Sequence, residues 1–352
     1  MLIVDHAHRA PHLLSVLASW AADETASPDF RAPGLVAAAV NADPQRLIAA
    51  DAGAPDGKNL LRVRMRTVAR GEFYGVDNDF PERLLALDFP GMLSHDQSNR
   101  DLVLEEAMRG GYPDGRFGTA DERHDFFHHL VRRICGKDLQ FVSKVRSSLT
   151  LRKVFRMAGA ASGEVLNLSQ LSSILGIGRP LVRRCLEALE ALYMIDRLSP
   201  WEAGLGIDRA VRSDRCYVSD SGWLCGLLGF CSVDPTALPE GSQTVVERLI
   251  SGWTRAQLGA LIDQRPQWRL SYFALRTGLS VEFLLENAQT SDLTAIRTST
   301  SERVDPGDFS DLARFRGLVR DRRVACIVLY CGQSVQRLEG LGAAVPLAFL
   351  WR

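Results

Sequence analysis

The chain has 352 residues, enough for two or three domains with their own cores, and its apolar fraction of 46% and charged fraction of 24% are ordinary for a globular protein. The 42 Lys and Arg residues balance the 42 Asp and Glu residues, which excludes a strong overall positive field, so nucleic-acid binding would have to depend on a local patch. The seven scattered Cys residues, the lack of an apolar run of about 18 residues and the lack of a signal-like N-terminus predict a cytoplasmic protein with no membrane partner.

Residues 1–90 have the pattern of an α/β domain. The expected elements are three strands and one helix, at residues 1–4, 34–40 and 60–68 for the strands and 10–24 for the helix. Asp5, His6 and His8 directly follow the first strand. They fit a metal-binding His cluster, an ATPase strand end at which Asp holds Mg²⁺, or the polar residues of an ordinary loop. The segment "GAPDGKN" is too short for a phosphate loop and lacks its Ser or Thr, so we interpret Lys58 as a loop residue.

Residues 91–163 are predicted to be mainly helical. Helices are expected at 95–109, 119–139 and 149–162, and the first of them ends at the strong stop signal Gly110-Gly111. His124 and His128 lie four residues apart on one face of the second helix, a spacing that a zinc pair could use. No Glu follows the first His and no third ligand is specified, so we expect no metal site there.

The segment "LNLSQLSSILGIGRPLVRRCLEALEALYMIDRL" predicts a helix-turn-helix. A short helix is expected to begin near Ser169, and a turn at residues 176–178 separates it from a second helix with Pro180 in its first position. One face of the second helix repeats apolar residues at Leu181, Cys185, Leu189 and Leu192. The strand-like "MIDRLSP" that follows favours a winged variant.

Arginines are concentrated in this predicted helix-turn-helix. Arg179, Arg183 and Arg184 lie in the first two turns of the expected recognition helix, and Arg212 lies in the expected wing. Arginine binds phosphates and guanine edges, so these residues are candidates for contacts with double-stranded DNA. Alternatively, they are solvated charges on a winged helix that packs against the rest of its own chain. The sequence leaves both interpretations open.

The last part of the chain has the pattern of a small α/β domain. A helix is expected at residues 244–262 and a crossover helix at 306–321. The expected strands are at 269–276, 280–287, 292–299, 325–331 and 345–351.

Four short motifs also occur in a fixed order. They are "LIVDHAHRAP" at 2–11, "GGYP" at 110–113, "GKDL" at 136–139 and "RCYVSDSGWLCGLLG" at 215–229. Their order and spacing, with the helix-turn-helix and the final α/β pattern, resemble a large prokaryotic family of AAA-type ATPases of unknown function with a winged helix and a C-terminal PD-(D/E)XK nuclease-like domain. The resemblance implies a multidomain α/β fold with a partial AAA-like parallel sheet at 1–90, a helical region at 91–163, a winged helix at 164–240 and a restriction-endonuclease-like domain at 241–352.

The resemblance also implies which catalytic groups are missing. Asp5 matches the Mg²⁺-positioning residue of the family's ATPase strand, but His6 stands where the family has Glu, and no phosphate loop precedes them. In the nuclease-like domain, Glu247 and Glu282 match acidic positions. Ala295 stands where the family has Glu and cannot bind a cation, and Arg297 stands where it has Lys and cannot act as a base. We therefore expect Asp5, Glu247 and Glu282 to be vestigial, with no catalytic residue and no metal.

These observations predict a non-catalytic binding protein derived from an ATPase and nuclease-like family. Its expected partner is DNA, contacted through the winged-helix arginines, or another protein. Two enzymatic alternatives stay open. The gene model could lack an upstream phosphate loop, in which case ATP and Mg²⁺ would be cofactors, or Glu247 and Glu282 could support weak Mg²⁺-dependent nuclease activity.

Overall fold

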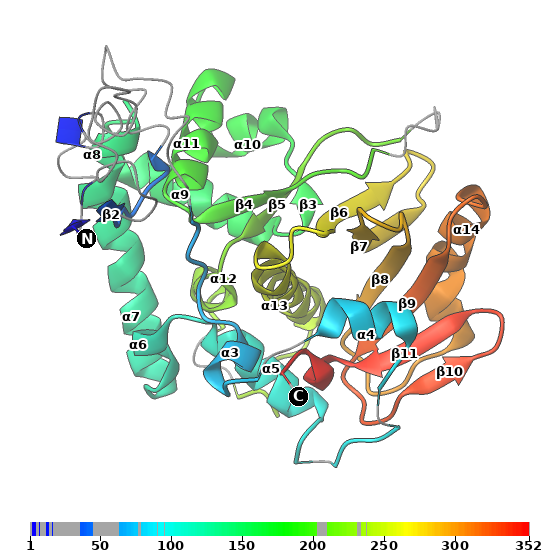
Figure 1. Ribbon diagram of the computed structural model, residues 1–352. Helices are drawn as coiled ribbons and strands as arrows, with labels where there is room; N and C mark the ends of the chain where they lie inside the picture. The colour runs from blue at the N-terminus through cyan, green and yellow to red at the C-terminus, as the bar shows by residue number, and fades with distance from the viewer. Residues whose placement is uncertain are drawn as a thin grey trace. The chain divides into compact units, whose positions relative to one another are not determined.

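The computed structural model describes residues 2–4, 7, 12–13, 16, 36–44, 63–76, 79–89, 91–94, 96–202, 210–230, 234–236 and 238–351 (Figure 1). The chain divides into two compact units, each built from separate stretches of sequence. The first comprises residues 1–65, 128–157 and 167–196, and the second comprises residues 66–127, 158–166 and 197–352. The fold is mixed α/β, with a six-stranded mixed sheet, a three-stranded sheet and a two-stranded parallel pair.

The first unit contains the two-stranded pair and several helices. In the pair, β1 (Leu2–Val4) runs parallel to β2 (Val36–Ala38), as expected from the two short apolar runs. The helical elements are η3 (Ile134–Asp138), α8 (Leu139–Val142), α10 (Leu168–Leu175), α11 (Arg179–Ala191) and most of α9 (Ser148–Ala160). The helix α7 (Ala120–Arg133) contributes residues to both units.

The strand expected at residues 60–68 does not form in the part that the structure describes, since residues 63–68 are irregular. The segment alternates apolar and polar residues, and this pattern predicted a strand with its apolar side inward. Instead, Val63 and Met65 are exposed. The arginine side chains form ion pairs within their own units, Arg64 with Asp196 and Arg66 Nε with Asp263 Oδ2 at 2.5 Å. The segment thus has ion-pair partners far along the chain, which the local pattern does not encode.

The second unit is built on the six-stranded sheet, in which the strand order is β10-β11-β9-β8-β7-β6. Its strands are β6 (Trp268–Ala274), β7 (Ser280–Asn287), β8 (Leu293–Ser299), β9 (Val324–Tyr330), β10 (Gln336–Leu338) and β11 (Gly342–Pro346). The strands β6, β7 and β8 are antiparallel, whereas β9 runs parallel to both β8 and β11. The expected final strand is shorter than predicted, because residues 347–351 form the 3-10 helix η5 (Leu347–Trp351).

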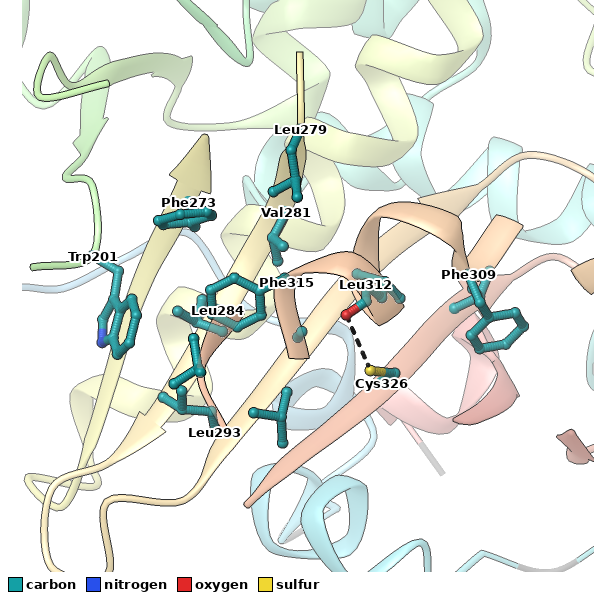
Figure 2. Packing of buried hydrophobic residues seen from close by; sticks show 14 of the residues in the cluster. Trp201, Phe273, Leu279, Val281, Leu284, Leu293, Phe309, Leu312, Phe315 and Cys326 are labelled. Atoms are coloured by element: carbon teal, nitrogen blue, oxygen red, sulfur yellow. Dashed lines mark hydrogen bonds between the residues drawn. The ribbon is translucent and has the colours of Figure 1, made fainter. Parts of the chain in front are cut away.

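The helices α14 and α13 pack on the sheet, and α4 (Phe80–Ala86) also contacts β8 and β9 (Figure 1). The crossover helix α14 (Ser310–Leu318), preceded by η4 (Pro306–Phe309), contributes Phe309, Leu312 and Phe315 to a hydrophobic cluster with Leu284 and other sheet residues (Figure 2). The long helix α13 (Gln243–Asp263) contacts β6 and β8. Residues adjacent in a strand point to opposite faces, so Phe283, which precedes Leu284 in β7, lies on the other face of the sheet.

The strand β6 lies at the edge of this sheet, and another part of the chain covers it. Trp201 N donates to Tyr272 O at 2.7 Å, and Tyr272 N donates to Ser199 O at 3.2 Å. Further along the strand, Val211 N donates to Ala274 O at 2.9 Å. Backbone groups of β6 that would otherwise face solvent are thereby paired.

Shorter elements complete the second unit. They are α3 (Arg70–Phe73), α4 (Phe80–Ala86), α5 (Arg100–Arg109), α6 (Pro113–Arg116), α12 (Ser221–Leu228), β3 (Glu164–Val165) and β5 (Arg215–Val218). Together with β4 (Ile195–Leu198), the strands β3 and β5 form the three-stranded sheet in the order β3-β5-β4. Within the described ranges, no helix is both long enough and apolar enough to cross a membrane.

Candidate functional site

The helices α10 and α11 are joined by a tight turn at residues 176–178. Asn167 begins α10, where its side chain accepts hydrogen bonds from two backbone amides of the first turn at 3.0 and 3.1 Å. Gly176 ends the helix in the left-handed conformation with φ of 64°, a conformation that glycine adopts without strain. Ser172 then closes the turn twice, since its carbonyl accepts from Ile177 N at 3.2 Å and its hydroxyl donates to Ile177 O at 2.6 Å. The geometry between the two helices is therefore well defined.

The helix α11 has one buried and one exposed face. It begins at Arg179 after Gly178, so Pro180 occupies the second helical position instead of the expected first one. Of the apolar residues expected on one face, Cys185, Leu189 and Leu192 are buried, whereas Leu181 is half-buried. The full set of buried α11 residues is Val182, Cys185, Leu186, Ala188, Leu189 and Ala191.

The exposed face of α11 carries positive charge. Arg179, Arg183 and Arg184 are all exposed, and the first turn contains no acidic residue. Among the residues that the structure describes, none forms an ion pair with these three arginines. Arg212 is also exposed, but it belongs to the second unit, where it follows the segment paired with the end of β6.

The two acidic residues Glu247 and Glu282, predicted to be vestigial, have neutral hydrogen-bond partners. Glu282 in β7 accepts from Thr298 N at 2.8 Å and from Thr298 Oγ1 at 2.8 and 3.0 Å. Glu247 Oε1 in α13 accepts from Gln243 Nε2 at 2.7 Å, and the same nitrogen donates to Thr300 Oγ1 at 3.0 Å. Each carboxylate thus accepts hydrogen bonds from amide or hydroxyl groups.

The positions expected for a second acid and a lysine are unsuited to cation chemistry. Ala295 in β8 is fully buried in the hydrophobic cluster against α14, between its strand partners Leu284 and Cys326. Arg297, two residues further on, is exposed and directs its guanidinium towards the Asp308 carbonyl at 3.5 Å. No cluster of three or more His, Cys, Asp or Glu residues suited to a metal occurs in the described part of the chain. A carboxylate at position 295 would project into hydrocarbon.

Several candidate residues of the N-terminal half remain predictions. Asp5, His6 and Lys58 lie outside the described residues, so the expected ATPase-like strand end is not part of the site geometry. His124 and His128 are exposed on α7.

Two of the sequence motifs meet at one buried junction, which sequence reasoning did not reveal. Asp220 is buried and begins α12, where Oδ1 accepts from Gly222 N at 2.8 Å and from Trp223 N at 3.3 Å. Its other oxygen, Oδ2, accepts from Gly111 N at 2.8 Å. Burial raises the pKa of the Asp220 carboxyl, and the backbone hydrogen bonds act in the opposite direction. The residue thus ties the "GGYP" motif to the start of α12.

The glycines of this junction are required by space. A Cβ on Gly110 would lie 2.5 Å from Asp220 Oδ1, and a Cβ on Gly222 would lie 2.2 Å from Phe127 Cζ. Tyr112 of the same motif packs its ring 5.1 Å from that of Trp223. The two motifs therefore form a packing contact that positions α5, α6 and α12. In this contact their residues have a structural role.

A buried ion cluster lies beside the junction. Glu106 forms ion pairs with both Arg70 and Arg116, and all three side chains are buried. Arg116 also donates to Gly110 O at 3.0 Å. Burial lowers the pKa of Arg116, but a guanidinium keeps its charge in a protein. One carboxylate is therefore shared by two buried cations.

Comparison with known proteins gives limited matches. A domain of unknown function (DUF8612) matches residues 100–234, the region that runs from α5 through the helix-turn-helix to α12. Two mycobacterial proteins, the uncharacterized protein Mb2031c of Mycobacterium bovis and the uncharacterized protein Rv2008c of Mycobacterium tuberculosis, are each 27% identical over 165 residues. The match covers 46% of this chain and 36% of each relative, so the chain spans about a third of the length of these curated relatives. No solved structure matches the chain.

Proposed function

We propose that this chain is a non-catalytic DNA-binding protein that contacts duplex DNA through the exposed face of α11. The observation that carries the proposal is the group of three exposed arginines, Arg179, Arg183 and Arg184, on the second helix of a helix-turn-helix. In proteins of this kind the second helix enters the major groove with its N-terminal residues. Arginines there bind phosphates and base edges.

The order of elements supports a winged helix around α11. The chain passes through α9, β3, α10, α11, β4 and β5, and the three strands form a sheet in the order β3-β5-β4. In this proposal the described residues 210–214, which precede β5, belong to the wing, and Arg212 is a second candidate for a phosphate contact. The positive and negative charges of the chain balance, so DNA binding would depend on these local arginines.

The proposal also includes the loss of nuclease chemistry. The succession of α13, the antiparallel strands β6 to β8, α14 and the parallel strand β9 supports a nuclease-like architecture for the last domain. Glu282 is hydrogen-bonded to Thr298, and position 295 offers only a buried methyl group. Metal-assisted cleavage needs a set of ligands that can hold the cation near the phosphate. We therefore expect no plasmid nicking with Mg²⁺ or Mn²⁺, and the same result for Glu282→Ala.

The DNA-binding proposal is tested by fluorescence anisotropy with a labelled duplex over a series of salt concentrations. The double variant Arg183→Ala with Arg184→Ala should bind about tenfold more weakly, and loss of two phosphate contacts should lower the salt slope by about 1.8. The matched control is Arg303→Ala with Arg320→Ala, which removes the same charge from exposed positions of the second unit. Equal losses in both double variants, or no duplex binding by the wild type at low salt, would refute the proposal.

A further inference from the structure

Three exposed aromatic side chains form a contiguous patch on the second unit. Phe73 at the end of α3 lies with its ring centroid 5.8 Å from that of Tyr74 and 5.5 Å from that of Phe117, which follows α6. Their exposed fractions are 39%, 57% and 75%, respectively. We call these three residues the aromatic patch. Single exposed apolar residues are common, but clustered exposed aromatics mark interaction surfaces.

Buried cations hold the aromatic patch from beneath. The Arg116 guanidinium lies 4.8 Å from the ring centroid of Phe73, and that of Arg70 lies 5.1 Å from the ring centroid of Tyr74. Both arginines are fixed by the shared carboxylate of Glu106. The rings are therefore anchored to a buried ion cluster before any partner binds, which lowers the ordering cost of association.

Exposed acidic residues border the aromatic patch. Glu72 precedes Phe73 in α3, and Asp114 lies in α6, three residues before Phe117. Glu122 packs beside Gly118, since a Cβ on that glycine would lie 2.9 Å from Glu122 Cβ. All three acids are exposed.

The cations near the aromatic patch are less accessible than these acids. Arg70 and Arg116 are buried with Glu106. Arg123 is half-buried and donates to Gly118 O at 2.7 Å. Arg265, which lines the same hollow as Glu72, is half-buried and pairs with Glu82. Among the described residues, the most accessible charges at the rim are thus acidic, which disfavours a nucleic acid and favours a cationic partner.

We propose that the aromatic patch docks a polypeptide segment of a protein partner, in which an apolar side chain is flanked by Lys or Arg. The apolar side chain packs on the rings of Tyr74 and Phe117, and the flanking cations pair with Glu72, Asp114 and Glu122. Aromatic anchors surrounded by complementary charge are the usual energetic centre of a protein interface. The aromatic patch and the arginines of α11 belong to different units of the chain.

The test uses the full chain and two fluorescein-labelled peptides of about 12 residues, one of repeating Arg-Leu-Gly units and one with Glu in place of each Arg. In anisotropy titrations the basic peptide should bind and the acidic one should not. The double variant Tyr74→Ala with Phe117→Ala should weaken binding of the basic peptide by at least about tenfold. The variant Asp114→Asn with Glu122→Gln should weaken it mainly at low salt.

Met92→Ala is the matched control, because Met92 is 70% exposed and also lies in the second unit. It should leave binding within about twofold of the wild type. If circular dichroism shows that the double variant is unfolded, Phe117→Ala alone is used as a milder variant. The proposal is overturned by equal binding of both peptides or by equal losses in the patch and control variants. It is also overturned if the aromatic substitutions abolish self-association, or single-stranded oligonucleotide binding, while leaving binding of the basic peptide intact.

Discussion

The junction at Asp220 makes a quantitative prediction about the stability of the second unit. Replacing Asp220 by Asn retains one carbonyl oxygen, which can still accept from Gly222 N and Trp223 N and so preserve the cap of α12. The new amide group donates, however, and would face the donating Gly111 N–H. A buried donor left without an acceptor costs about 1–3 kcal/mol, so Asp220→Asn should lower the free energy of unfolding by that amount.

Replacing Asp220 by Ala removes the cap as well. Loss of an N-cap costs about 1 kcal/mol, so the total loss in Asp220→Ala should be about 2–4 kcal/mol. The control is Asn99→Ala, because Asn99 caps α5 through a hydrogen bond from Leu102 N at 2.8 Å. We expect a loss of about 1 kcal/mol in that variant.

Urea unfolding followed by tryptophan fluorescence is suited to this comparison. Most tryptophans of the chain belong to the second unit, namely Trp201, Trp223, Trp253, Trp268 and Trp351. If Asp220→Asn proves no more destabilising than Asn99→Ala, the hydrogen bond between Gly111 and Asp220 does not anchor the two motifs.

Three further outcomes are expected. Gly222→Ala brings a Cβ to 2.2 Å from Phe127 Cζ, so overpacking should lower the free energy of unfolding by about 1–3 kcal/mol in the same urea assay. An unchanged midpoint of urea unfolding would contradict the predicted overpacking. Ala295→Glu places a carboxyl group in the hydrophobic cluster, so it should destabilise the protein by about 3 kcal/mol. The variant should not gain Mg²⁺-dependent plasmid nicking. Cleavage by this variant would show that position 295 can reach a metal site. Burial raises the pKa of the Cys331 thiol from 9.0 to about 12. Because only the thiolate reacts, alkylation of Cys331 by iodoacetamide in the folded protein should be about a thousandfold slower than that of an ordinary thiol near neutral pH. Mass spectrometry follows the reaction. Because the folded state favours the neutral thiol, Cys331 contributes stability that is present below about pH 9 and is lost as the pH rises towards 12; Cys331→Ser should lack that part of the pH dependence.

The sequence predicted elements whose signal is local. The strand β7 coincides with the apolar run at residues 280–287, which Gly278 and the turn at Ser291 delimit. The helix α11 was evident from its apolar period and the preceding glycines. The exposure of its arginines also agrees with the pattern, since these residues lie off the apolar face.

The remaining features depend on contacts between distant residues. Gly111 and Asp220 are 109 positions apart, and neither motif contains a signal for the other. Residues 63–68 do not form the expected strand, and the local alternation carries no information about the pairing of Arg66 with Asp263. The aromatic patch was missed for the same reason, since Phe73 and Phe117 come together only through the packing of α3 and α6.

The backbone pairing along the edge strand β6 has a consequence for the expression of fragments of this chain. A fragment that begins at residue 241, where the pattern of elements predicts a domain boundary, would lose residues 199–201 and 210–211. It would leave the amide and carbonyl of Tyr272 and the carbonyl of Ala274 without these partners. Bare outer strands recruit strands from other molecules, so this fragment would tend to form fibrils or precipitate. A fragment that carries this sheet should therefore retain residues 199–201 and 210–211. It should also retain residues 66–127 of the same unit, because Gly111 there donates to Asp220 at the start of α12.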